Sequence, residues 1–171
     1  MNAVPAAAPT VPDRYPTRIT GTPAVLGRHE PVVRGGAGAG GPMAPEQLAA
    51  FEADGFVVLD HLLGAGEVAR LLDEVERLAA PGASDAARLV REPDGDDVRS
   101  VFEVHRSSPL VGGLVADPRV AGLARQVLGS DVYVHQSRVN RKPGFVGQGF
   151  SWHSDFETWH AEDGMPGPRA V

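Results

Sequence analysis

The chain has 171 residues, 42% of them hydrophobic and 22% charged, which is enough apolar material for one domain with its own core. Sixteen Lys and Arg against 22 Asp and Glu give a net charge of -6, which argues against a nucleic-acid binder or a polybasic membrane-surface module. The chain has no cysteine. Disulfides, Cys-ligated zinc, iron–sulfur clusters and thiol catalysis are therefore excluded, and a metal site must use His and carboxylate ligands.

The sequence predicts a soluble cytoplasmic protein, because it has no apolar run long enough to span a bilayer and no signal peptide at its start. Residues 1–16 are rich in Ala and Pro, and residues 34–42 (RGGAGAGGP) are rich in Gly. We therefore expect a flexible arm and linker over residues 1–42 and an ordered domain over residues 43–171. A phosphate-binding loop is disfavoured, since no Gly-Lys-Ser/Thr follows the glycines.

Short helices and strands are expected from Met43 onward. Pro45 suits the first position of a helix that ends at Asp54-Gly55, and the apolar residues 56–59 predict a short strand. Apolar residues at helical spacing predict a second helix over residues 66–80. The remaining expected elements are a polar loop over 82–99, a strand over 101–105, helices over 109–114 and 118–128, and a half-buried strand over 132–140.

Residues 149–160 (GFSWHSDFETWH) concentrate groups that can carry chemistry: both tryptophans, two of the six histidines and two acids. His153 and Asp155 are separated by one residue, and on a strand such residues project from the same face. The imidazole and the carboxylate would then converge on one point. That arrangement supplies two of the three ligands of the two-His-one-carboxylate site of non-haem Fe(II) oxygenases.

A His-x-Asp pair does not by itself define a metal site. It can be a surface ion pair or a capping interaction, and the aromatic residues around it can belong to a core. A zinc hydrolase is less favoured, because the chain has neither His-Glu-x-x-His nor cysteine. A Ser-His-Asp hydrolase that uses Ser151 or Ser154 stays formally open, although no Gly-x-Ser-x-Gly motif is present.

The stretch from His135 to Arg169 closely resembles the ectoine hydroxylases, in the phytanoyl-CoA-dioxygenase-like branch of the Fe(II)/2-oxoglutarate oxygenases. The run WHSDFETWHAEDGMP carries most of this resemblance, and Tyr15–Arg18, Glu30–Val33 and residues 43–80 are also similar. The resemblance implies an α+β, mainly β fold. Its core would be a double-stranded β-helix (a cupin-like jelly roll) with N-terminal helices, and this chain would contain it incompletely.

The resemblance also implies roles for eight residues. His153 and Asp155 would bind Fe(II), while Gln136 and Trp159 would contact ectoine. Four more residues would line the 2-oxoglutarate site and the pocket wall: Lys142, Arg138, Asn140 and Phe150. A cationic side chain suits the dianion 2-oxoglutarate, and the face of a tryptophan suits the amidinium cation of ectoine.

Simpler roles stay open for some of these residues. Lys142 can be solvated, and Gln136 can bond only to backbone. We expect His135 and His160 to be structural. The implied partner is the small molecule ectoine, with a homodimer as a further expectation.

The implied reaction converts ectoine to 5-hydroxyectoine while O2 and 2-oxoglutarate give succinate and carbon dioxide. The family pattern also requires a second His ligand and an anchor for the distal carboxylate of 2-oxoglutarate, both well downstream. Only 16 residues follow Asp155, and His160 is too close to replace the remote ligand. We therefore expect an N-terminal portion of such an enzyme that is inactive alone. A hydroxylase of another small molecule and a non-catalytic fragment are the alternatives.

Overall fold

The computed structural model describes Tyr15, Gly27 and residues 30–93, 95–142, 144, 147 and 149–171. These residues belong to two compact units. The larger unit is Arg28–Ser151 with Ala170–Val171, and the smaller unit joins Met1–Gly27 to Trp152–Arg169. Apart from Tyr15, the predicted N-terminal arm (residues 1–16) lies outside the described residues. In the part of the chain that the structure describes, no helix is long and apolar enough to cross a membrane.

The first two helices of the larger unit confirm the predicted ones to within a residue. Helix α1 (Pro45–Asp54) begins with its proline and ends at Gly55, whose φ of 79° lies in the left-handed region that favours glycine. Helix α2 (Ala65–Ala79) begins after Gly64, and Glu67 Oε2 accepts a hydrogen bond from the Gly64 backbone N–H at 2.8 Å. That bond satisfies a backbone donor at the start of the helix.

Two of the next three helices agree with the predicted ones as well. Helix α3 is one turn (Val104–Ser107), and α4 (Pro109–Ala116) and α5 (Pro118–Leu128) both begin with proline. The Ser108 hydroxyl accepts from the Val111 backbone N–H at the start of α4, and the Asp117 carboxylate accepts from the Arg119 N–H at the start of α5. These side chains cap the helices, which is why α4 and α5 are separate.

The strands depart further from the predictions. Strands β1 (Leu89–Arg91), β2 (Val98–Phe102) and β3 (Arg138–Asn140) form an antiparallel sheet in the order β1-β2-β3. The predicted loop over 82–99 is wrong in part, since it holds a 3-10 turn (Ala86–Arg88) and β1. The strand predicted over 101–105 begins earlier and gives way to α3, and the strand predicted over 132–140 forms only at its end.

The predicted strand over residues 56–59 is wrong. Phe56 and Val58 are 65% and 71% exposed, while Val57 and Leu59 pack against apolar residues of α1 and α5. The alternating burial is that of a strand, but none of the described strands pairs with this segment. Without a partner for its backbone groups, the segment stays irregular.

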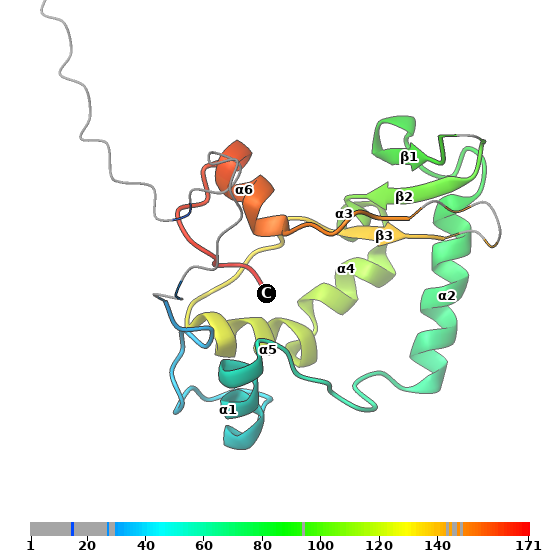
Figure 1. The fold of residues 1–171 in the computed structure, drawn as a ribbon. Coiled ribbons are helices and arrows are strands. Elements are labelled where there is room, and N and C mark those ends of the chain that lie inside the picture. The colour runs from blue at the N-terminus through cyan, green and yellow to red at the C-terminus, as the bar shows by residue number, and fades with distance from the viewer. Residues whose placement is uncertain are drawn as a thin grey trace, which may run out of the picture. The chain divides into compact units, whose positions relative to one another are not determined.

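Two separate apolar clusters stabilise the larger unit. In Figure 1, α1 lies beside α5 at one end, and the C-terminal part of α2 lies beside the sheet at the other. The first cluster contains Val33, Met43, Leu48 and Val127, and the second contains Leu78, Val98, Val101 and Val104. Helices and a small antiparallel sheet thus form an α+β arrangement.

The glycine-rich segment 34–42 differs from the flexible linker that its composition predicts. The Gln126 side chain donates to the carbonyl oxygens of Ala39 and Met43, at 2.8 and 2.9 Å, and accepts from the Met43 N–H at 2.8 Å. The Gly35 N–H donates to Val127 O at 3.1 Å. A methyl group on Gly35 would overlap the carbonyl oxygen of Gln126. Glycine is needed there for close packing on α5.

Candidate active site

His153 and Asp155 lie close together, but they do not share a strand. Asp155 is the first residue of α6 (Asp155–Asp163), and His153 lies in the irregular segment before it. The local structure predicted for the pair is therefore wrong. The two side chains still face each other, with His153 Nε2 3.6 Å from Asp155 Oδ1, and each is about half exposed. The turn of backbone into the helix brings them together.

The pair fits two positions of a metal site. Imidazole nitrogen and carboxylate oxygen are the donors that non-haem Fe(II) uses. Neighbouring donors on one metal ion, with bonds of about 2.0–2.2 Å, lie roughly 3–3.5 Å apart, so the separation of 3.6 Å is close to that spacing. Among the described residues, no group of three or more His, Cys, Asp or Glu side chains is placed to hold a metal ion. Iron binding by His153 and Asp155 stays a prediction.

Trp159, the residue expected to contact ectoine, follows Asp155 by four positions on α6 and is half-buried. Residues four apart share one side of a helix, so Asp155 and Trp159 line the same side. Tyr15 packs on this helix, since its ring contacts Phe156 and His160, and the sequence predicts no such contact. No pattern in the sequence links Tyr15 to residues so far along the chain.

Five of the eight predicted site residues belong to the larger unit. Arg138 and Asn140 lie on β3 at alternate positions, as predicted, whereas Gln136 is exposed and precedes the strand. Asn140 Oδ1 accepts from the Ser100 hydroxyl on β2 at 2.8 Å. Lys142 is exposed just after β3. The expected alternation is thus present for two residues, and Asn140 has a partner within the sheet.

Phe150, the expected pocket-wall residue, is covered on one face by Arg99 of β2. The guanidinium carbon of Arg99 lies 4.0 Å from the ring centroid, within the range of a cation–π contact. Arg99 also donates to Gly149 O at 3.2 Å and to Glu92 Oε2 at 3.1 Å. The motifs in the sequence predict no role for Arg99. This contact joins residues about fifty positions apart, and a single sequence gives no signal for it.

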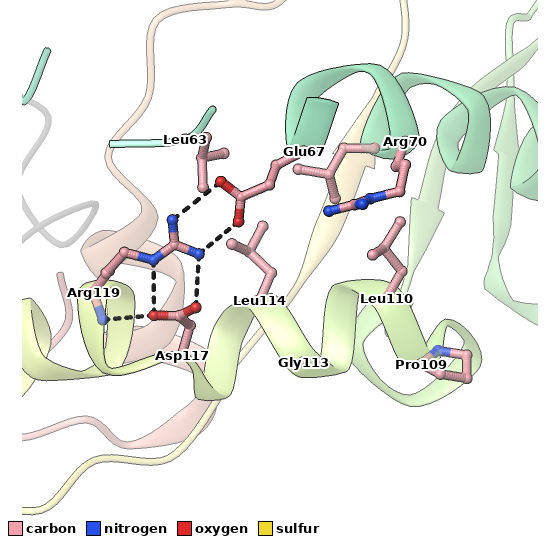
Figure 2. A pocket seen from close by; sticks show the side chains of 10 residues that line it. Leu63, Glu67, Arg70, Pro109, Leu110, Gly113, Leu114, Asp117 and Arg119 are labelled. Atoms are coloured by element: carbon pink, nitrogen blue, oxygen red, sulfur yellow. Dashed lines mark hydrogen bonds and ion pairs between the residues drawn. The ribbon is translucent and has the colours of Figure 1, made fainter. Parts of the chain in front are cut away.

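A cavity of about 240 Å³ lies between α2 and α4, away from every predicted site residue of its unit. Figure 2 shows Leu110 and Leu114 of α4 facing it, with Glu67, Asp117 and Arg119 together at one side. Its apolar lining includes Leu63, Leu71, Leu110 and Leu114, and its charged lining is Glu67, Arg70, Asp117 and Arg119. None of the eight residues implied by the resemblance lines this cavity.

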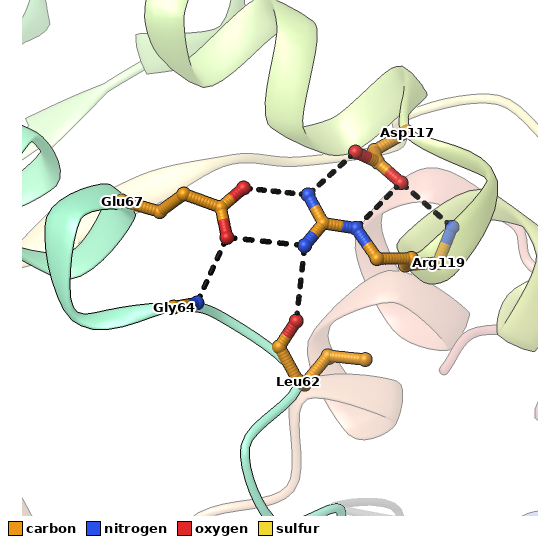
Figure 3. Close-up of polar contacts among 5 residues, drawn as sticks. All are labelled: Leu62, Gly64, Glu67, Asp117 and Arg119. Carbon is orange, nitrogen blue, oxygen red and sulfur yellow. Dashed lines mark hydrogen bonds and ion pairs between the residues drawn. The ribbon is translucent and has the colours of Figure 1, made fainter.

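Arg119 bonds to two carboxylates at the edge of that cavity (Figure 3). It donates to Glu67 Oε1 at 2.6 Å, to Asp117 Oδ2 at 2.8 Å and to the carbonyl oxygen of Leu62 at 3.1 Å. These bonds lower the pKa of Glu67 to about 2, with a further contribution from the Gly64 N–H, and lower the pKa of Asp117 to about 2. The bonds from Arg119 to Glu67 and to the Leu62 carbonyl oxygen join the start of α5 to the start of α2, and we call this cluster of Arg119, Glu67 and Asp117 the Arg119 clasp.

The curated relatives of this chain are ectoine dioxygenases, and the solved structures that it resembles are of EctD. It is 54% identical over 160 residues to the ectoine dioxygenase of Nocardia farcinica, covering 93% of this chain and 52% of that protein. For the ectoine dioxygenase of Streptomyces coelicolor, identity is 51% over 162 residues, covering 94% and 54%. The chain thus spans about half the length of the curated relatives it matches.

The crystal structure of EctD from S. alaskensis with 2-oxoglutarate and 5-hydroxyectoine superimposes with a TM-score of 0.86 at 47% identity, over 92% of this chain and 56% of that one. The structure of the same protein with bound Fe superimposes with a TM-score of 0.78 at 50% identity, over 83% and 51%. The phytanoyl-CoA dioxygenase (PhyH) family profile matches residues 51–171, most of the chain. On this evidence the chain belongs to the phytanoyl-CoA dioxygenase family.

Proposed function

We propose that this chain is part of an Fe(II)- and 2-oxoglutarate-dependent dioxygenase that hydroxylates ectoine to 5-hydroxyectoine. One observation carries the proposal. His153 Nε2 and Asp155 Oδ1 lie 3.6 Å apart, in a chain about half identical to ectoine dioxygenases over 93% of its length. A His and a carboxylate side by side are two of the three ligands that such an enzyme needs.

His153 and Asp155 would hold the iron in this proposal. When bound, iron and 2-oxoglutarate supply the oxidising chemistry, and the protein supplies orientation and exclusion of water. Lys142 and Arg138 would neutralise the dianion 2-oxoglutarate, since a carboxylate binds most strongly to a cationic donor. Trp159 would place its ring face against the amidinium cation of ectoine. The other expected pocket residues are Gln136, Asn140 and Phe150.

The finer fold assignment belongs to the same proposal. We expect strands β1, β2 and β3 to be part of a double-stranded β-helix, and residues beyond these 171 to supply its remaining strands. The similarity to EctD, at a TM-score of 0.86 over 92% of this chain, supports the assignment. The third iron ligand and the distal 2-oxoglutarate anchor would come from the same additional residues. A cytoplasmic location and a homodimer remain predictions.

The decisive experiment compares the 171-residue chain with the protein encoded by the whole reading frame. Both receive Fe(II), 2-oxoglutarate and ectoine, and succinate and 5-hydroxyectoine are measured. We expect turnover by the longer protein only, because two ligands hold iron weakly. Ectoine-dependent turnover by the 171-residue chain would contradict the proposal that residues beyond it supply part of the site. A longer protein that binds iron but oxidises another small molecule in a substrate panel would overturn the assignment of ectoine.

A further inference from the structure

Tyr15 packs edge-on against two rings of α6. Its ring centroid lies 5.0 Å from that of Phe156, at 81° between planes, and 5.7 Å from that of His160, at 76°. Phe156 and His160 stack on each other at 5.3 Å and 26°. Edge-to-face and offset-stacked arrangements at these separations are the favourable ones for aromatic rings. Tyr15 is thus packed on the helix that begins with Asp155.

The rings of Phe156 and His160 form a row along α6. This row lies next to the one formed by Asp155, expected to bind iron, and Trp159, expected to contact ectoine. Asp155 and Trp159 are four residues apart and share one side of the helix. Phe156 and His160 each follow by one residue and share the adjacent side. Both rows belong to one short helix, so a contact that holds the ring row fixes the rotation of the helix about its axis. It thereby fixes the directions of Asp155 and Trp159.

Met165 holds the other end of α6. Its backbone N–H donates to the carbonyl oxygen of Trp159 at 3.0 Å, and its own carbonyl oxygen lies 2.6 Å from His160 Nδ1. A carbonyl oxygen only accepts, so Nδ1 carries the proton in this contact. Gly164, with a φ of 72°, turns the chain back to make both bonds. His160 is therefore contacted by Tyr15 on one side and by Met165, after the helix, on the other.

We propose that Tyr15, Phe156 and His160 form an aromatic buttress that orients α6, with Tyr15 and His160 as positioning residues for iron and ectoine binding. This inference rests on the proposed function and adds to it a role for Tyr15. The buttress acts through Asp155 and Trp159. Replacing Tyr15 leaves Asp155 and Trp159 in the chain, but Phe156 and His160 lose their contact with the Tyr15 ring.

The main test uses Tyr15→Ala in the protein from the whole reading frame, with Tyr15→Phe as the conservative variant. Tyr133→Ala, at the chain's other tyrosine, is the matched control because Tyr133 is 80% exposed and belongs to the other unit. We expect Tyr15→Ala to lower kcat/KM for ectoine about ten- to hundredfold, since small misplacements near a reacting centre have effects of that size. Tyr15→Phe and Tyr133→Ala should stay close to the unmodified protein.

Two further measurements separate positioning from general stability. Tyr15→Ala should weaken Fe(II) binding measured anaerobically, without turnover, and should form succinate in excess over 5-hydroxyectoine. His160→Asn keeps a donor for Met165 but lacks the ring, and it should show the same excess. A Tyr15→Ala protein that melts earlier yet keeps its iron affinity and equimolar products would overturn the buttress. If the unmodified protein does not act on ectoine, the proposed function fails, and the iron affinity of Tyr15→Ala still decides on the buttress.

Discussion

The imidazole of His153, just before α6, and the carboxylate of Asp155, the first residue of α6, lie 3.6 Å apart. In the protein from the whole reading frame, we expect Asp155→Ala to abolish Fe(II)-dependent formation of succinate and 5-hydroxyectoine, because the proposed site would lose the carboxylate ligand that Asp155 supplies. Asp163→Ala, at the other end of the same helix, is the control and should keep activity. Activity that survives in Asp155→Ala would exclude Asp155 as a ligand.

Trp159→Ala should weaken ectoine binding more than iron binding. A cation over a tryptophan face contributes about 0.5–2 kcal/mol, so the ectoine KM should rise roughly two- to thirtyfold. The matched control is Trp152→Ala, since Trp152 is fully exposed. Steady-state kinetics and anaerobic iron titration measure the two effects separately. If Asp155→Ala and Trp159→Ala lose iron equally, the division of roles between these residues is wrong.

The Arg119 clasp should make stability depend on acid pH. The pKa values of Glu67 and Asp117 are lowered to about 2, whereas carboxyl groups of an unfolded chain titrate near pH 4. Because the folded values are lower, the stabilisation is fully present above about pH 5 and is lost as the pH falls toward 2. In Arg119→Gln, the melting temperature should therefore fall less steeply as the pH is lowered from about 5 toward 2.

Thermal unfolding between about pH 7 and pH 2, followed by circular dichroism, measures this dependence. Arg125→Gln is the control, because its partner Asp131 is fully exposed and 3.6 Å away, and such a pair contributes little. If the melting temperature falls equally steeply with acid pH in Arg119→Gln and in the unmodified chain, the Arg119 clasp does not couple protonation to folding.

Gln126 should be sensitive even to a conservative change. Its buried amide serves two backbone carbonyls and one N–H of the segment before α1. Gln126→Leu leaves these groups without partners and should cost about 1–3 kcal/mol of unfolding free energy. Gln126→Glu keeps the acceptor but loses both donors. Its free energy of unfolding, measured by urea denaturation, should therefore also be lower than that of the unmodified chain. Equal stability of all three would contradict the arrangement.

Gly35→Ala should destabilise the chain where Gly38→Ala does not. The added methyl group overlaps the backbone of Gln126 at residue 35, whereas at residue 38 no atom lies within 4 Å. Overpacking of this kind costs about 1–3 kcal/mol. Denaturation midpoints of the two variants give the comparison, and similar midpoints would show that the segment can move away from α5.

The helices could be predicted because their ends carry local signals. Pro45 and Gly55 delimit α1, and Pro118 and Gly129 delimit α5, each by a backbone preference of a single residue. Strand β1 has three residues, too few to show any periodicity. Residues 56–59 show the alternating burial of a strand. A strand also needs a second strand to pair with, and the local sequence does not show whether one is present.

The candidate site could be predicted in its residues but not in its local structure. His153 and Asp155 come together at the start of a helix, because an extended residue followed by a helical turn can also direct side chains two positions apart to one point. The contacts of Tyr15 with α6 and of Arg99 with Phe150 join distant parts of the chain. One sequence contains no periodicity or spacing that would reveal such pairs.

The anchoring of the glycine-rich segment on Gln126 has a practical consequence for anyone who shortens the protein. Composition suggests a start at Met43, after the last glycine. Such a version would discard Val33, which belongs to the cluster around α1 and α5, and would leave the Gln126 amide without its contact to Ala39. A stable shortened form should therefore begin before Val33, so that it keeps both this apolar contact and the glycine-rich segment that packs on α5.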